Sequence, residues 1–204
     1  MKSRLDFKCM LKYFNMNILI VTAHPSKNSH TQKIADTYKH TKKSKGHIVK
    51  VIDLYSTEYQ IPFLAFESIR EVVPTKEVLE MREMVTWANE IVVVHPIWWS
   101  FTPAIIKNWA DHIFWTGYAY KYKKDGSVEK LLKGKTAKVF ATAGGIGWIY
   151  KLPLTPLKTF WKTAIFGFVG IKVVDFKVCD KLNILKEEKL DKHFAKFLEK
   201  IKKS

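Results

Sequence analysis

Residues 90–114 read EIVVVHPIWWSFTPAIIKNWADHIF, and this stretch decides the fold. The run Glu90–Val94 is apolar and β-branched after its first residue, without the polar alternation that would give it a wet face. It predicts a strand buried on both sides, as the strands of a parallel sheet are. After a loop, Pro103–Phe114 shows the spacing of an amphipathic helix. The stretch therefore indicates a strand–loop–helix unit of an α/β protein.

The same unit recurs on both sides of this stretch. Further strands are predicted at Asn17–Val21, His47–Leu54, Thr136–Thr142 and Ile171–Val178, and further helices at Thr31–Lys43, Thr75–Asn89 and Lys186–Lys202. This alternation predicts an α/β fold with a five-stranded parallel sheet and helices on both faces. We expect the flavodoxin-like strand order 2-1-3-4-5. The sequence predicts the fold class better than the strand order, because hydrophobic periodicity does not show which strands are neighbours in the sheet.

A chain of 204 residues suits one domain. We assign the domain to residues 16–204 and expect residues 1–15 to be a flexible extension, because they lack the apolar core of a secretion signal. The apolar runs fall far short of the roughly 20 residues that span a bilayer. The two cysteines, Cys9 and Cys179, cannot build a disulfide framework or a zinc cluster. We therefore expect a cytoplasmic protein without a metal site.

The formal net charge of +16 raises the question of nucleic-acid binding. The lysines near the C-terminus, however, alternate with acidic residues such as Glu187, Asp191 and Glu199, a pattern typical of a solvated helix face. We therefore expect no nucleic-acid partner. A basic surface still attracts anionic ligands such as a phosphorylated dinucleotide.

Ligands of open parallel sheets bind outside the carboxyl ends of the strands, so the loops there are informative. Residues 22–31, TAHPSKNSHT, lead small polar groups to a helix N-terminus, where unpaired backbone N–H groups favour a phosphate. An ordinary N-cap by Asn28 or Ser29 explains this loop equally well.

The loops after the third and fourth predicted strands are also unusual. Residues 95–103, HPIWWSFTP, place large aromatic side chains in a loop, which indicates either a flat ligand or packing under the loop or in an interface. Residues 141–150, ATAGGIGWIY, carry paired glycines at a strand end, where the backbone can approach a ligand closely.

Together these loops resemble one family. The sequences His24-Pro25, Pro96-Ile97-Trp98-Trp99, PAIIKNWAD at 103–111 and TAGG at 142–145 are similar to those of the flavodoxin-like NAD(P)H:quinone oxidoreductases. That family includes quinone reductases, drug-activity modulators and ancillary oxidoreductases of potassium efflux systems. The resemblance runs from about residue 16 to the C-terminal helix. It implies an enzyme that passes two electrons by hydride transfer, in a ping-pong cycle, from NADPH or NADH through a bound flavin to quinones or similar aromatic acceptors.

The resemblance also implies the residues that bind the cofactor. The residues expected at the flavin phosphate and ribityl chain are His24, Ser29, His30 and Thr31. The residues expected along the ring are Pro96, Ile97, Trp98 and Trp99, and those near its polar edge are Thr142, Ala143, Gly144 and Gly145. Shorter members of the family use FMN, so the length of this chain favours FMN over FAD.

Tyr150 stands where family members carry a tyrosine that donates to the reduced flavin, so the resemblance implies a catalytic role for it. Some members carry a histidine six residues further on, where this chain has Pro156, and Lys151 could replace its charge. Tyr118, Tyr120 and Tyr122 resemble the family's substrate-facing aromatic segment, which is often contributed across a dimer. A β-strand edge with alternating tyrosines is the other interpretation of this segment.

We expect a homodimer, because residues 115–122 and 160–171 are more hydrophobic than the surface of a monomer normally is. Two other functions compete with the enzyme. One is an electron-carrier flavodoxin, although those proteins are typically acidic. The other is a regulatory flavoprotein subunit that docks peripherally on a membrane transporter.

Overall fold

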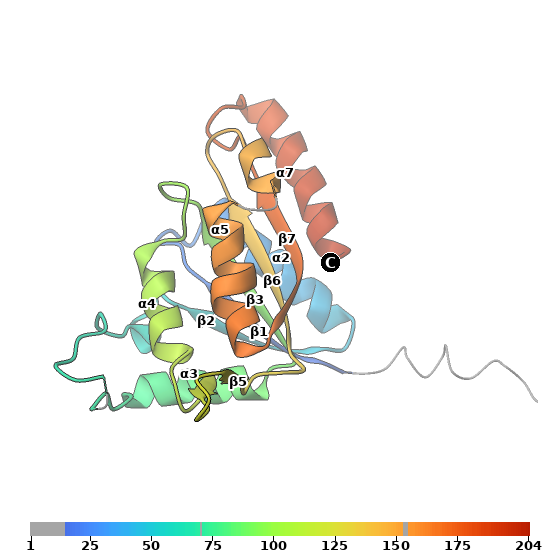
Figure 1. Ribbon diagram of the computed structural model, residues 1–204. Helices are drawn as coiled ribbons and strands as arrows, with labels where there is room; N and C mark the ends of the chain where they lie inside the picture. The colour runs from blue at the N-terminus through green and yellow to red at the C-terminus, as the bar shows by residue number, and fades with distance from the viewer. Residues whose placement is uncertain (1–14, 70, 153–154) are drawn as a thin grey trace, which may run out of the picture.

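The computed structural model describes residues 15–69, 71–152 and 155–204. Its centre is a parallel sheet in the order β2-β1-β3-β6-β7 (Figure 1). The strands are β1 (Asn17–Thr22), β2 (Ile48–Asp53), β3 (Glu90–Pro96), β6 (Thr136–Thr142) and β7 (Lys172–Cys179). The predicted fold class and strand order are both confirmed. Residues 1–14, which make up most of the predicted N-terminal extension, lie outside the described residues.

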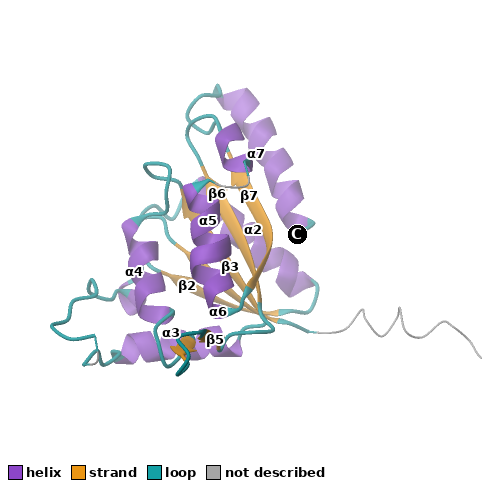
Figure 2. Cartoon of the chain, in the orientation of Figure 1, coloured by secondary structure: helices purple, strands orange, loops and turns teal. Residues whose placement is uncertain are grey.

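Helices cover both faces of this sheet (Figure 2). On one face lie α2 (His30–Ser44) and α7 (Glu187–Lys202), packed on Ile18, Ile20 and Val92. The other face carries α3 (Lys76–Trp87), α4 (Ala104–Ile113) and a helical segment made of α5 (Pro156–Thr159), η4 (Phe160–Ile165) and α6 (Phe166–Val169). Because successive strand side chains point to opposite faces, wholly apolar strands supply a core to both layers. All four predicted helices form within two residues of their expected bounds.

The segment α5–η4–α6 corrects one prediction. Residues 160–171 are not a hydrophobic surface, since Trp161 and Phe166 are fully buried against the sheet within one chain. The hydrophobicity of this segment therefore gives no support for a dimer. The helix escapes detection in the sequence because η4 is a π-helix, whose wider turn breaks the 3.6-residue spacing.

Short elements complete the fold. They are η2 (Thr57–Tyr59), η3 (Trp148–Lys151) and a hairpin of β4 (Tyr120–Tyr122) and β5 (Val128–Lys130). In the described residues, every helix is too short or too polar to cross a membrane.

Candidate active site

A cavity of about 370 Å³ opens at the carboxyl ends of β1, β3 and β6. Its wall brings together residues from the three loops that the sequence analysis singled out. Ten of the predicted cofactor residues line it: His24, Ser29, His30, Thr31, Pro96, Ile97, Trp98, Thr142, Ala143 and Gly144. Ser26, Leu182 and Asn183 also line it and were not predicted.

The N-terminus of α2 forms one wall. The Ser29 hydroxyl accepts a hydrogen bond of 3.1 Å from the Gln32 N–H, so Ser29 is the N-cap. The capping interpretation of this loop is therefore correct, but it leaves the amides of His30 and Thr31 without a partner among the described residues. The first turn of α2 also contains no acidic residue. Free N–H groups at the positive end of the helix dipole suit an anion at this point.

The two histidines of this loop are held in place. Nδ1 of His24 accepts a hydrogen bond of 3.0 Å from the Ser26 N–H and also lies 3.2 Å from the Ser26 carbonyl oxygen. The His30 ring packs edge-on against Phe194, with the ring centroids 4.5 Å apart. Burial, and secondarily Lys33, lower the pKa of His30 below its usual value. The rings of His24 and His30 both line the cavity.

The loop after β3 forms the second wall. A tight turn closes it, because Trp98 and Phe101 exchange backbone hydrogen bonds of 3.0 and 2.9 Å. Between them, Trp99 and Ser100 have φ values of 50° and 62°, a conformation that costs non-glycine residues energy and recurs at functional sites. Trp98 lines the cavity, whereas the Trp99 side chain is fully exposed and does not.

Behind this wall lies His95, which the sequence analysis did not assign to the site. The ring is completely buried, and its Nδ1 lies 2.8 Å from the carbonyl of Pro96. Its Nε2 accepts a hydrogen bond of 3.1 Å from the indole N–H of Trp161 on η4. The ring is therefore neutral, with its proton on Nδ1, and burial lowers its pKa to about 4. His95 thus links the carbonyl of a cavity residue to the helical layer behind it.

The glycine loop after β6 forms the third wall, and the loop after β7 holds it. Backbone N–H groups of Lys181 and Asn183 donate to the carbonyls of Gly145 and Gly144, at 2.7 and 3.1 Å. A Cβ at Gly144 would lie 2.6 Å from Nδ2 of Asn183, so a larger residue there would displace that exposed side chain. A Cβ at Gly145 would meet nothing within 4 Å. The general rule that ligands contact the ends of several strands could have found Leu182 and Asn183.

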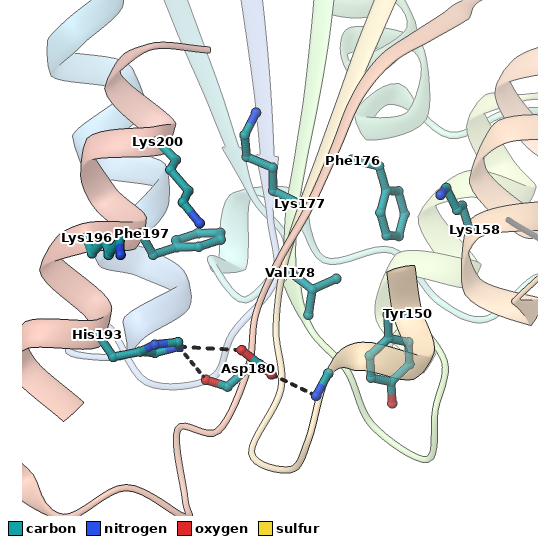
Figure 3. A pocket seen from close by; sticks show the side chains of 11 residues that line it. Tyr150, Lys158, Phe176, Lys177, Val178, Asp180, His193, Lys196, Phe197 and Lys200 are labelled. Atoms are coloured by element: carbon teal, nitrogen blue, oxygen red, sulfur yellow. Dashed lines mark hydrogen bonds and ion pairs between the residues drawn. The ribbon is translucent and has the colours of Figure 1, made fainter. Parts of the chain in front are cut away.

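Tyr150 does not line this cavity. It lies on η3 and lines a second cavity, together with Gly147 and residues of β7 and α7 (Figure 3). Pro156 is exposed in the first turn of α5, and the side chain of Lys151 is outside the described part of the chain.

The predicted substrate tyrosines lie away from the first cavity of their own chain. The Tyr118 hydroxyl donates a hydrogen bond of 2.7 Å to the Arg82 carbonyl on α3. Tyr120 and Tyr122 lie on β4, and their rings meet edge to face at 5.6 Å. None of the three lines the cavity.

A doubly wound parallel sheet with a helix N-terminus and an aromatic loop around a cavity at its carboxyl edge is the arrangement of flavodoxin-like proteins. The chain matches, over residues 16–204, the model of the family described as flavodoxin-like fold, and it belongs to that family.

Individual relatives give a narrower view. The chain is 30% identical over 178 residues to the FMN-dependent NADH:quinone oxidoreductase 2 of Clostridium acetobutylicum, covering 81% of this chain and 86% of the relative. It is 29% identical to an NAD(P)H oxidoreductase of Haemophilus influenzae, covering 85% and 88%. A crystal structure from Streptococcus mutans superposes with a TM-score of 0.78 at 27% identity, covering 93% of this chain and 100% of that one. The resemblance to flavodoxin-like quinone oxidoreductases, and with it the prediction of an enzyme of that kind, is confirmed.

Proposed function

We propose that the protein binds FMN in the first cavity and transfers two electrons from NADH or NADPH to quinones or similar aromatic acceptors, in a ping-pong cycle. The observation that carries this proposal is the shared cavity of the α2 N-terminus, Trp98 and Gly144. The name of the relative from Clostridium acetobutylicum includes FMN, NADH and quinone, and this supports the same chemistry for the present protein.

The residues present fit FMN. The amides of His30 and Thr31, with the ring of His24, would hold the phosphate, and Ser29 and Thr31 would lie beside the ribityl chain. Pro96, Ile97 and Trp98 would line the ring, and the loop Thr142–Gly145 would approach its polar edge. The open space over Gly145 suits that approach. When bound, the flavin would supply the hydride and two-electron chemistry.

The protein's own residues would position and stabilise this group. The His95 ring contacts the Pro96 carbonyl, and the Ile97 N–H donates a hydrogen bond of 2.7 Å to the Thr142 carbonyl, which joins two walls of the cavity. We assign Tyr150 as the hydroxyl donor to the polar edge of the ring. A fixed donor where charge develops would stabilise the transition state more than the ground state.

We also propose a homodimer in which Tyr118, Tyr120 and Tyr122 contribute to the substrate side of the partner's site. The fully exposed Trp99 beside the cavity and the exposed Tyr122 support this arrangement. Both are large aromatic side chains on the surface of one chain, and a partner chain would bury them. The chain would work in the cytoplasm, where NADH and NADPH are available.

Purified protein tests the function directly. We expect a flavin absorption spectrum, FMN as the compound released on heating, and oxidation of NADH or NADPH coupled to reduction of a soluble quinone. A colourless protein that takes up no added FMN would overturn the proposal. Slow single-electron exchange without nicotinamide oxidation would instead support the electron-carrier flavodoxin. Recovery with membranes and activity only there would support the regulatory subunit.

A further inference from the structure

A second cavity, of about 470 Å³, lies beside β7 (Figure 3). Phe176, Lys177 and Val178 all line it, although successive side chains on a strand point to opposite faces. A cavity that touches all three must therefore wrap around the outer edge of β7. That edge is open among the described residues, because β7 is the last strand of the sheet.

Cations surround this edge. Along α7, His193, Lys196, Phe197 and Lys200 form one stripe facing the cavity, and Lys158 of α5 faces it from the other side of β7 (Figure 3). The Lys158 ammonium lies 5.9 Å from the centre of the Phe176 ring.

Most of these cations have no counter-charge. Lys177 pairs with Asp175, and the carboxylate of Asp180 accepts a hydrogen bond of 2.9 Å from the Gly147 N–H and lies 3.5 Å from Nε2 of His193. In the described ranges, Lys158, Lys196 and Lys200 pair with no carboxylate. The three unpaired ammonium groups around the second cavity are complementary in charge to a multiply charged anion.

The rest of the lining suits a nucleoside phosphate. Phe176 offers ring surface for a base, the lysines offer donors for a phosphate monoester, and the volume is typical of ligand sites. A monoester carries close to two negative charges at neutral pH.

The cavity also adjoins the proposed active site. Gly144 lines the first cavity, and Gly147 and Tyr150 of the same loop line the second. We propose that the second cavity binds the 2′-phosphorylated adenosine end of NADPH while the nicotinamide lies at the flavin, and that it makes the enzyme prefer NADPH to NADH. This inference rests on the proposed function, since it names the donor of that reaction.

The test compares two double variants with equal loss of charge. Lys196→Ala/Lys200→Ala removes two lysines of the cavity, and Lys189→Ala/Lys203→Ala removes two exposed lysines at α7 that do not line it. We expect kcat/KM for NADPH to fall about tenfold in the first variant only, and kcat/KM for NADH to stay within about twofold in both, as loss of contacts to one phosphate predicts.

A binding measurement keeps the two proposals apart. By calorimetry, 2′,5′-ADP should bind the unmodified protein more tightly than 5′-AMP or inorganic phosphate, and the cavity variant should lose this binding while the control keeps it. Equal binding of 2′,5′-ADP to both variants, or none to the unmodified protein, would overturn the inference. Specific binding without any flavin or nicotinamide oxidation would overturn the proposed function and leave a nucleotide site. Equal use of NADPH and NADH by an active enzyme would refute only the inference.

Discussion

The indole N–H of Trp161 on η4 donates a hydrogen bond of 3.1 Å to Nε2 of His95 on β3, deep inside the protein. The other ring nitrogen of His95 faces the carbonyl of Pro96, which lines the first cavity. The π-helical turn and the cavity wall are thus connected through one neutral histidine. π-Helical turns are frequent at functional sites, and here the π-helix η4 supports the wall of the first cavity through His95.

Protonation of His95 should destabilise the fold. Burial lowers its pKa to about 4 from the ordinary value of 6.5, so between these values the unfolded chain binds more protons than the folded one. Stability is therefore lost as the pH falls through this range. We expect the free energy of unfolding to drop by about 2 kcal/mol more in the unmodified protein than in His95→Gln between about pH 7.5 and pH 5.

Urea denaturation at both pH values measures this difference. His40→Gln is the matched control, because His40 is exposed on α2 and the variant should keep the full pH dependence. The same drop in His95→Gln as in the unmodified protein would contradict the prediction.

Gly145→Val should abolish FMN retention and leave the fold intact. The added side chain meets no protein atom within 4 Å of its Cβ, so it would occupy space that the ring needs. Gly144→Val is the comparison, because its Cβ would clash with Asn183 and lower thermal stability as well. Flavin stoichiometry and the melting temperature are measured together, and full stoichiometry in Gly145→Val would place the loop away from the cofactor.

Tyr150→Phe should slow reduction of the bound flavin by NADPH about tenfold, or about 1.4 kcal/mol, with FMN affinity unchanged. One lost donor in a well-organised site costs roughly 2.7–4 kcal/mol, and a half-exposed tyrosine should cost less. Pro156→His should partly restore the second donor that other family members carry at this position. Stopped-flow spectroscopy measures both variants, and an unchanged rate in Tyr150→Phe would leave backbone groups as the stabilisers.

Light scattering at micromolar concentration should give twice the chain mass of 23.8 kDa. Trp99→Glu should shift the protein toward the monomer, because a charge would replace a fully exposed indole beside the cavity. Leu79→Glu, at an exposed position on α3, should leave the dimer intact. A monomeric mass for the unmodified protein would decide against the homodimer and the shared tyrosines.

The layers of the fold and most of the lining of the first cavity were predictable from the pattern of residues along the chain. Strands without a polar face, such as residues 91–94, can only be buried between two layers, so local pattern is enough to place them in a parallel sheet. The carboxyl ends of such strands meet at one edge, which is why His24, Trp98 and Gly144 come together as expected.

Features that depend on contacts between distant segments of the chain could not be predicted from its sequence. Trp161 is buried and donates a hydrogen bond to His95, and the Asn183 N–H donates one to the Gly144 carbonyl. Each of these contacts joins residues far apart in the chain. The second cavity also exists only because β7 ends the sheet between α5 and α7. Hydrophobic periodicity shows which face of a helix or strand is buried. It contains no information about which side chains of two different layers are in contact.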